Sequence, residues 1–340
     1  MNISKANRNR RPTQFDVAKL AGVSQTAVSS VLNNSATISI PEETRKRILD
    51  AIQDLDYVPD RSARSLRTQK TYTIATIIPD ITNPFYPAFI RGIQDVANHN
   101  GYDLIIYNTD GVLAEEQKCL SSVKQNQVDG LIVAAFHLEE DELLAINTPI
   151  VHVNKTNREA PVLDSIYVDS IAMAHTAVSH LIERGHLRIG MIAGIEDSPP
   201  GYNCILGYRR AMAEHNLTVE DAFIHGGQFI EEGGYLAMEK LLEITPRLSA
   251  VFAANDLMAL GAFMAIREAG LRIPQDIALV GIDDIPAARM VTPALTTINQ
   301  FQKDIGQRAA EMLFNRFSGM SDGAPYSVEM PFSLIVREST

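Results

Sequence analysis

A run of polar side chains between positions 24 and 33 has the chemistry needed to contact nucleic acid. Hydroxyl and amide groups can hydrogen-bond to base edges and to phosphate oxygens. Helical spacing would place them on the outer face of one short helix, opposite the apolar Val28, Val31 and Leu32. The candidate DNA-contacting residues of this stretch are Ser24, Gln25, Thr26, Ser29, Ser30 and Asn33. Thr13 is a further candidate from the start of the preceding helix.

A helix-turn-helix would position this polar face. The preceding helix has an apolar face made of Val17, Ala18, Leu20 and Ala21. Gly22 tolerates the left-handed backbone that ends a helix, and Ser24 stands at the natural N-cap of the next one. Such a pair can place its second helix in the DNA major groove. Taken alone, the pattern also fits an ordinary helical hairpin.

Residues 41–56 predict a third helix. Pro41 suits a first helical turn, and the acidic pair that follows it favours the positive end of the helix dipole. An apolar stripe that would close a three-helix core consists of Ile48, Ala51, Ile52 and Leu55. The next segment, 57–68, is too short and too polar to be stable as an isolated helix, and its composition is typical of a linker.

Charge is distributed unevenly along the chain. The overall net charge is −11, yet residues 1–70 hold 12 Lys+Arg and 7 Asp+Glu, a net +5, and the remaining 18 basic and 34 acidic residues give −16. A basic end on an acidic body concentrates the attraction to DNA at that end. The N-terminus lacks the apolar stretch of a signal peptide, and two cysteines form no disulfide framework, so a cytoplasmic protein is expected.

From residue 73 onward, short aliphatic runs alternate with helical stretches. The runs, typical of buried parallel strands, are TIATIIP, LIIY, GLIVAA, IVHV, IGMIAG, AVFAA and IALVGI. The helical stretches are 87–99, 113–126, 170–184, 203–215, 232–243, 255–269 and 301–317. This alternation predicts an α/β fold with doubly wound parallel sheets. About 270 residues exceed one comfortable core, so we expect two lobes with a ligand site at the strand ends between them.

Residues 13–67 resemble the DNA-binding head of the LacI/GalR (lactose-repressor) family. The matching pieces are DVAKLAGVS, VSxVLN, EETRxRIL, YxP and ARSL. The resemblance implies a hinge helix that folds on operator DNA, with Arg64 contacting DNA and Leu66 wedged into the minor groove. It also implies a homodimer on a pseudo-palindromic operator. The chain ends without the leucine-heptad tail of a few members, so a dimer is expected rather than a tetramer.

The remainder resembles the core of the same family, a two-lobed fold like that of type I periplasmic binding proteins. The resemblance lies in PDITNPFY (79–86), VDGLIV (128–133), HLIERGHLRIG (180–190), ANDLMALG (254–261), GIDD (281–284) and TPALTTI (292–298). The implied domains are a helix-turn-helix domain (1–58), a hinge and linker (59–72) and an effector-binding core (73–340). We expect the first lobe to hold 73–168 and 299–326, and the second 169–298 and 327–340.

The same resemblance implies residues that would hold a small effector between the lobes. Phe85, Tyr86 and Phe229 would supply aromatic walls, while Asn255 and Asp283 would hydrogen-bond to the ligand. Sealing of the lobe interface by the aromatic rings, or capping of a loop by Asp283, remains an alternative. The further candidates are Asn154, Ser198 and Cys204. The implied ligand is a sugar or a related, nucleoside-like polar metabolite.

Several positions depart from the family pattern. Ala27-Val28-Ser29-Ser30 replaces the usual Thr-Val-Ser-Arg, which removes a guanine-reading arginine, and Asp60 replaces an asparagine. Cys204 stands where many relatives have an arginine that clamps the ligand, and Asn154 stands where many have aspartate. A bidentate clamp for an anion is therefore missing, which predicts a less anionic or larger effector, or a weak response. A redox role for the Cys204 thiol is a minor alternative.

The sequence offers no support for an enzymatic function. No P-loop, no GxGxxG after the first strand and no GxSxG elbow is present, and the eight histidines are scattered. No cofactor is expected. The resemblance therefore implies a ligand-responsive transcriptional repressor that acts as a homodimer on operator DNA. The alternatives are an activator or dual regulator, and a sugar-binding protein without a regulatory role.

Overall fold

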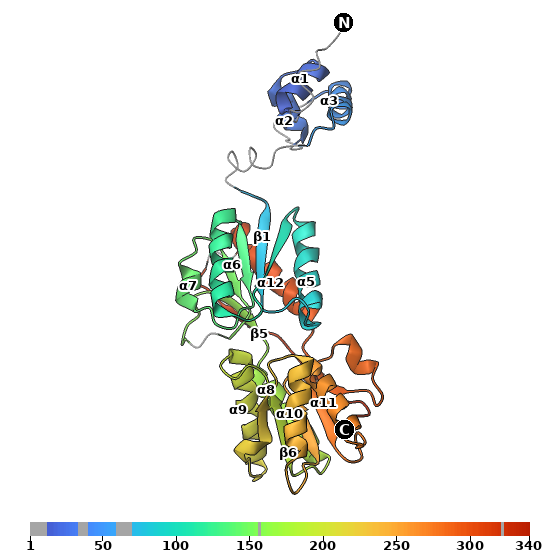
Figure 1. The fold of residues 1–340 in the computed structure, drawn as a ribbon. Coiled ribbons are helices and arrows are strands. Elements are labelled where there is room, and N and C mark those ends of the chain that lie inside the picture. Colours follow the sequence, from blue (N-terminus) through green and yellow to red (C-terminus); the bar gives the residue numbers. More distant parts are fainter. Residues whose placement is uncertain (1–11, 33–39, 59–69, 156–157, 321–322) are drawn as a thin grey trace. The chain divides into compact units, whose positions relative to one another are not determined.

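The computed structural model describes residues 12–32, 40–58, 70–155, 158–320 and 323–340 (Figure 1). They belong to two compact units, Met1–Thr71 and Tyr72–Thr340. We call the first unit the head and the second the core. No helix in these described stretches is long and apolar enough to span a membrane.

Three helices form the head. They are α1 (Gln14–Ala21), α2 (Gln25–Leu32) and α3 (Glu42–Asp54). Thr13 and Asp16 make a capping box at the start of α1, and Gly22 ends that helix in the left-handed conformation with φ 65°. The Ser24 hydroxyl accepts a hydrogen bond from the backbone N–H of Ala27 at 3.2 Å, which caps the first turn of α2.

The small core of the head follows the predicted helix faces with one correction. Its buried members are Val17, Ala18, Ala21, Val28, Val31, Ile48 and Ala51. Leu20 was expected on the inner face of α1, but its side chain is 54% exposed. The face that packs is formed by positions i, i+1 and i+4, and position i+3 lies on its flank at 100° per residue.

Two six-stranded sheets form the core and confirm the predicted doubly wound fold. The first has the order β11-β5-β4-β3-β1-β2 and all its pairs are parallel. Its strands are β1 (Thr73–Ile78), β2 (Asp103–Asn108), β3 (Gly130–Val133), β4 (Ile150–His152), β5 (Asp164–Tyr167) and β11 (Ser327–Glu329).

The second sheet has the order β12-β10-β9-β8-β6-β7, with only the β10–β12 pair antiparallel. Its strands are β6 (Ile189–Ala193), β7 (Ile224–Gly226), β8 (Ala250–Ala253), β9 (Ala278–Asp283), β10 (Thr296–Asn299) and β12 (Ser333–Ile335). The central strands are completely buried, as continuous aliphatic runs predict.

Helices cover both sheets (Figure 1). The first sheet has α5 (Phe85–His99) and α12 (Gln302–Phe317) on one face, and α6 (Leu113–Asn126) and α7 (Glu140–Leu144) on the other. In the second lobe, α8 (Ser170–Glu183) packs on α9 (Pro199–Glu214), and α10 (Glu231–Leu242) on α11 (Asp256–Glu268).

Two glycines let α5 and α12 touch backbone to backbone. A Cβ on Gly92 would lie 2.1 Å from the carbonyl oxygen of Lys303, and one on Gly306 would lie 1.9 Å from that of Phe89. Neither contact is possible for a larger residue without moving a helix. The packing of the first lobe therefore depends on both glycines.

The structure corrects two boundaries expected from the sequence, that between the lobes and the start of α9. The lobe boundary expected at 326 falls too early, because Ser327–Glu329 pairs in parallel with β5 and extends the first sheet. The chain therefore returns to the second lobe after β11, in addition to passing between the lobes after β5 and after β10. Helix α9 begins at Pro199 rather than at 203, because Ser198 caps it and proline is tolerated in a first turn.

Candidate functional site

The DNA-facing candidates of the head have different surroundings. Ser24, Gln25 and Thr26 are exposed and Ser29 is half-buried. Ser30 is only 8% exposed, so its expected place on the outer face is wrong. It follows Ala27 by three positions and directly precedes Val31, both of which contact the core of the head. Ser30 therefore belongs to the inner margin of α2.

Of the other DNA candidates, the structure describes only Thr13. Thr13 caps α1: its hydroxyl donates to the Asp16 carboxylate at 2.6 Å and accepts from the Asp16 backbone N–H at 3.4 Å. Its demonstrated role is thus to fix the start of the helix. Asn33, Asp60, Arg64 and Leu66 lie outside the described residues.

A cavity of about 490 Å³ lies between the two lobes of the core. Its lining comes from segments that follow the carboxyl ends of strands in both sheets, where open parallel sheets bind ligands. The predicted effector residues that line it are Phe85, Tyr86, Asn154, Cys204, Phe229, Asn255 and Asp283. Ser198 is the exception among the effector candidates.

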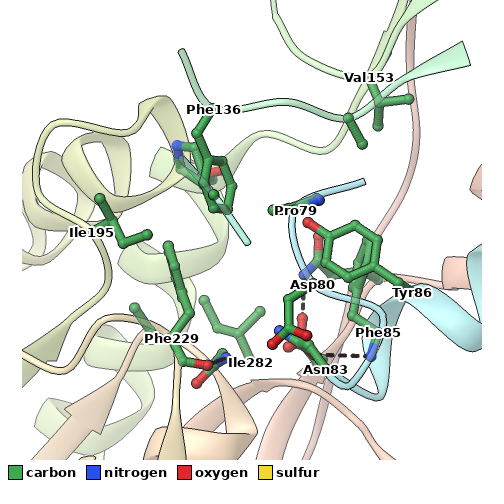
Figure 2. A pocket seen from close by; sticks show the side chains of 18 of the residues that line it. Pro79, Asp80, Asn83, Phe85, Tyr86, Phe136, Val153, Ile195, Phe229 and Ile282 are labelled. Atoms are coloured by element: carbon green, nitrogen blue, oxygen red, sulfur yellow. Dashed lines mark hydrogen bonds between the residues drawn. The ribbon is translucent and has the colours of Figure 1, made fainter. Parts of the chain in front are cut away.

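Aromatic rings stand on opposite sides of this cavity (Figure 2). Phe85 and Tyr86 from the start of α5 meet edge to face, with ring centroids 5.0 Å apart. Across the cavity, Phe229 packs against Phe136 with centroids 5.9 Å apart and an angle of 30° between the rings. Sequence analysis missed Phe136, although its position directly after the GLIVAA strand segment was a usable signal. The two walls suit a flat ligand.

A glycine makes room for the wall formed by Phe136 and Phe229. A Cβ on Gly194 would lie 2.0 Å from the Phe229 ring, so the ring rests directly on the glycine. Asn255 holds the backbone of Phe229, because its side-chain amide donates to the Phe229 carbonyl oxygen at 3.0 Å. The same side chain accepts from the Met258 N–H at 2.9 Å and caps α11. Asn255 therefore positions the wall besides lining the cavity.

Ser198 has a structural role instead of the expected contact with the effector. Its side chain is completely buried, donates to the carbonyl oxygen of Ile195 at 2.6 Å and accepts from the N–H of Gly201 at 3.2 Å. These two bonds hold the turn between β6 and α9. They position Ile195 and Pro200, which do line the cavity.

Asp283 forms part of the cavity floor at the end of β9. It is 5% exposed, and its backbone has φ 122°, a conformation that L-residues rarely adopt. Its carboxylate accepts a hydrogen bond from the Gln300 amide at 2.7 Å, and its carbonyl oxygen accepts one from the Gln302 side chain. Gln300 lies between β10 and α12 and Gln302 is the first residue of α12, so this crossing between the lobes holds Asp283 in place.

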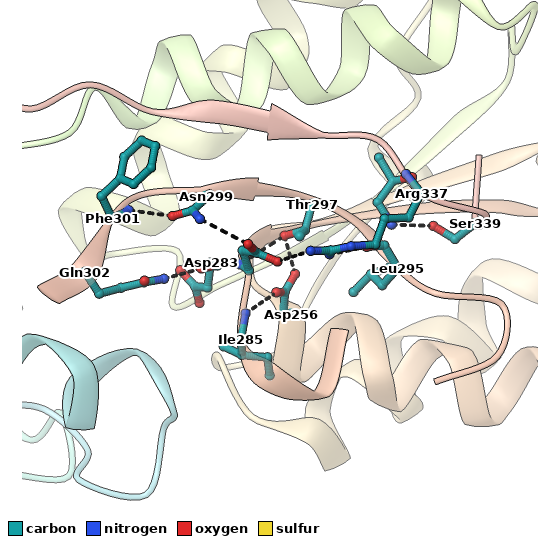
Figure 3. Close-up of polar contacts among 12 residues, drawn as sticks. Asp256, Asp283, Ile285, Leu295, Thr297, Asn299, Phe301, Gln302, Arg337 and Ser339 are labelled. Atoms are coloured by element: carbon teal, nitrogen blue, oxygen red, sulfur yellow. Dashed lines mark hydrogen bonds and ion pairs between the residues drawn. The ribbon is translucent and has the colours of Figure 1, made fainter. Parts of the chain in front are cut away.

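A buried network lies behind Asp283 (Figure 3). The Asp256 carboxylate accepts from the Thr297 hydroxyl at 2.6 Å and from the backbone N–H of Ile285 at 3.0 Å. Burial raises the pKa of Asp256 to about 7 despite these bonds. Burial and the neighbouring Asp256 charge also hold the pKa of Asp283 well above its usual range. Asp284 is paired with Arg337 and so has its own counter-charge.

Cys204 is a buried thiol in the wall of the cavity. Burial raises its pKa to about 12, and the nearby Asp283 carboxylate contributes in the same direction. The thiol is therefore neutral and cannot serve as a ready redox sensor. Its surroundings oppose the minor redox interpretation and leave Cys204 as an uncharged part of the wall.

A helix-turn-helix head joined to a two-lobed core with a cavity at its strand ends defines a DNA-binding regulator controlled by a small molecule. Residues 14–60 match the family model described as bacterial regulatory proteins, lacI family. Residues 178–340 match the model of a periplasmic binding protein-like domain.

Relatives match nearly the whole chain. The HTH-type transcriptional repressor PurR of Pectobacterium carotovorum subsp. carotovorum (strain PC1) is 36% identical over 329 residues, which cover 95% of each chain. The ribose operon repressor of Escherichia coli (strain K12) is 36% identical over 310 residues, covering 90% of this chain and 93% of the repressor. The Lac repressor dimer bound to operator and the anti-inducer ONPF has a TM-score of 0.87 at 25% identity, with 97% and 99% of the two chains covered.

The chain belongs to the lacI family of bacterial regulatory proteins. It is a transcriptional repressor with a helix-turn-helix DNA-binding domain and an effector-binding domain. Like these relatives, it is a regulator and not an enzyme.

Proposed function

We propose that the protein represses transcription as a homodimer on a pseudo-palindromic operator, and that a small molecule in the inter-lobe cavity controls its binding to DNA. The observation that carries this proposal is the pairing, in one chain, of an exposed polar helix face in the head with an aromatic-walled cavity in the core. The solved Lac repressor with 25% identity is a dimer on its operator, which supports the dimeric arrangement.

In this mechanism, the effector changes the angle between the lobes. Gln300 and Gln302 connect Asp283 to the segment that links β10 and α12, so a ligand at Asp283 acts directly on a connection between the lobes. Movement of the first lobe would bring the hinge segments of the dimer, residues 59–67, together or apart. Their folding on DNA, with Arg64 and Leu66 in contact with the duplex, would then become more or less favourable.

The domain limits that accompany this proposal are 1–58 for the head, 59–72 for the hinge and linker, and 73–340 for the core. The effector is a compact sugar or nucleoside-like molecule, which the aromatic walls and the polar groups of Asn154, Asn255 and Asp283 suit. A related regulator with 30% identity has been solved as a complex with cellobiose, and another with 28% identity with bound ribose. The regulator acts in the cytoplasm, where the operator is.

Selection from a pool of randomised duplexes at near-physiological salt tests the DNA-binding part. We expect a pseudo-palindrome with a flexible central step, bound at roughly 10⁻⁸ M or tighter. Gln25→Ala should weaken binding to it by about 10-fold, because the exposed amide would lose its contacts with a base edge. Gln53→Ala, an equally exposed glutamine on α3, is the matched control and should change little.

Weak binding without sequence preference, in the presence and absence of cavity ligands, would contradict the proposal. A pseudo-palindrome located where bound protein recruits rather than blocks polymerase would favour the alternative of an activator.

A further inference from the structure

The charged groups that line the cavity are all acidic. Asp80 follows β1, Asp110 follows β2 and Asp283 ends β9, so carboxylates reach the cavity from both lobes. Within the part of the chain that the structure describes, no lysine, arginine or histidine lines it. A ligand that enters this space therefore meets acidic side chains from both lobes and no basic one among the described residues.

Neutral groups hold two of these carboxylates. Asp283 is bonded to the amide of Gln300, and Asp80 accepts from the backbone N–H and hydroxyl of Thr82 at 2.8 and 2.6 Å. A buried carboxylate is stable when an opposite charge lies beside it, and a neutral amide supplies only part of that stabilisation. The cavity thus offers Asp283 a place for a counter-charge that the protein does not itself provide.

Two cations that adjoin the lining residues, one bound to the neighbour of Asp283 and one that follows Asn154, are paired elsewhere. Arg337 is bound to Asp284 behind the cavity floor. Lys155 lies over the Tyr167 ring at 5.2 Å and faces Asp169 at 3.7 Å. Neither side chain is part of the cavity lining, so neither neutralises Asp283 within it.

The aromatic walls suit a cation as well as a flat body. The faces of phenyl and phenol rings attract cations, more strongly where water is excluded. Tyr86 adds a hydroxyl that has no hydrogen-bond partner among the described residues, and its pKa is raised by burial and by the charges of Asp283 and Asp80. That hydroxyl is free to accept a hydrogen bond from an N–H group of a ligand.

Other ligand charges fit less well. An anionic ligand would lie beside acidic side chains with no basic side chain in the lining, and a neutral sugar would supply no counter-charge to favour the ionised form of Asp283. A metal ion needs converging ligands, and no group of three or more candidate metal-ligating side chains exists among the described residues.

We infer that the effector carries a positive charge, as an ammonium or guanidinium-like group beside Asp283, on a flat body held between the Phe136–Phe229 pair and the Phe85–Tyr86 pair. This inference rests on the proposed function, because it assigns a chemical class to the ligand of the same cavity. The ammonium donates to the free positions of the Asp283 carboxylate, and the charged pair is then shielded by the aromatic rings.

Two matched sets of probes test the sign of the charge by isothermal titration calorimetry on the full-length protein. Tryptamine, tryptophol and indole-3-acetate share an indole, whereas glucosamine, glucose and glucuronate share a sugar ring. We expect the ammonium member of at least one set to bind about 10-fold or more tightly than its neutral and acidic partners, as charge-assisted hydrogen bonds allow.

Two carboxylate variants and one control test whether the preference for the ammonium probe arises in the cavity. Asp283→Asn should reduce the preference for the ammonium to about 3-fold or less, and Asp80→Asn, which keeps an acceptor for Thr82, should reduce it in part. Glu183→Gln removes an exposed charge at the end of α8, outside the cavity lining, and should leave the preference intact. Melting curves of the variants verify that each is folded, and Asp80→Asn carries the test if Asp283→Asn is not.

Tighter binding of the neutral or acidic members would overturn the inference, as would the absence of binding by both ammonium probes up to about 10 mM. The proposed function is judged separately. A protein that binds its selected operator and releases it with glucose refutes only the charge assignment. A protein that prefers tryptamine yet selects no operator refutes only the proposed control of DNA binding.

Discussion

At the scale of single residues, the cavity is distinguished by groups whose charge depends on their surroundings. Asp283 is buried beside Asp256, and the pKa of its carboxyl is held high by burial and by that neighbour. Cys204 is neutral because burial raises its pKa to about 12. Burial therefore favours the neutral form of Asp283, and a ligand that supplies a positive charge beside it would favour the ionised form.

The pH dependence of probe binding should follow the ionisation of Asp283. Since its pKa is raised, the carboxylate forms only as pH increases, so tryptamine should bind more tightly at pH 8 than at pH 6. Tryptamine itself stays protonated over this range. Tryptophol should bind with little dependence on pH.

Other titratable groups face the same site and need controls. They are Asp256 with a pKa of about 7, Asp80, Asp110, Asp284 with its partner Arg337, Tyr86 and Cys204. Asp283→Asn should remove most of the pH dependence if Asp283 is responsible. An unchanged pH profile in that variant would show that another of these groups causes the effect.

Both thiols should be unreactive in the native protein. Burial raises the pKa of Cys119 and of Cys204, so the reactive thiolate is scarce at neutral pH. Reaction of Cys204 with a thiol reagent should be at least about 100-fold slower than in the unfolded chain, because each pKa unit lowers the thiolate fraction tenfold. Comparison of Cys119→Ala and Cys204→Ala assigns the rates; fast labelling of Cys204 would revive the redox interpretation.

The sequence anticipated cavity residues where the resemblance to the family marked their positions. Asn255 and Asp283 were predicted in this way, but their hydrogen bonds were not. Asn255 donates to Phe229 and Asp283 accepts from Gln300, and each bond joins segments that are distant in sequence. Ser198 was assigned to the ligand through the family resemblance, whereas its buried hydroxyl holds a turn. Phe136 was overlooked although it directly follows the GLIVAA strand segment, because it lies outside the motifs that carried the family resemblance.

At the scale of elements, buried strands were predictable and edge strands were not. Six of the seven aliphatic runs form interior strands of the two sheets, and the seventh forms β2 at an edge of the first sheet. Strands such as β7, β11 and β12 are three residues long and lie at or next to an edge, so their sequences lack a long apolar run. The β11 strand was assigned to the wrong lobe because only its pairing with β5, 162 positions earlier, locates it.

Packing of α5 on α12 should depend strongly on Gly306. A Cβ there would meet the Phe89 carbonyl oxygen at 1.9 Å, so Gly306→Ala should destabilise the core by about 1–3 kcal/mol through forced backbone movement. Gly323→Ala is the matched control, because a Cβ at Gly323 meets nothing within 4 Å. Denaturant unfolding of both variants measures the difference; equal stabilities would contradict the close approach of the two helices.

His152 in β4 should make the core sensitive to acid. Burial lowers its pKa to about 4, and its Nδ1 has no hydrogen-bond partner among the described residues. The unfolded chain takes up the proton near pH 6.5, so this contribution to stability is complete above that pH and decreases as pH falls toward 4, by up to about 3 kcal/mol.

His152→Leu should flatten the decline between pH 6.5 and 4, whereas His99→Leu, at an exposed histidine on α5, should not. The opposite tendency of Asp256, whose raised pKa lowers stability as pH increases, is common to both variants and cancels in the comparison. The free energy of unfolding measured at several pH values provides the test. Parallel curves for His152→Leu and the unmodified protein would show that another group causes the acid sensitivity.

At the scale of the whole molecule, the order of the sequence segments revealed the architecture. A basic helical segment followed by alternating strands and helices indicated a DNA-binding head and a doubly wound core, and the structure has both. The way in which the chain passes repeatedly between the two lobes could not be predicted, because it depends on the pairing of short strands. Those passages matter for function, since Gln300 and Gln302 lie on one of them and hold Asp283.

The most direct test of the account is the thermodynamic coupling between the cavity and the operator. The dissociation constant of the selected operator is measured by fluorescence anisotropy with and without a saturating concentration of the tightest cavity probe. The dissociation constant of that probe is then measured with and without the operator.

If one protein links the two sites, both measurements must change by the same factor, expected at about 5- to 150-fold. Asn255→Ala, which removes the amide that holds Phe229, should weaken probe binding while leaving the operator affinity of the unliganded protein nearly unchanged. A probe that fills the cavity but leaves operator affinity unchanged would contradict the claim that the cavity controls DNA binding.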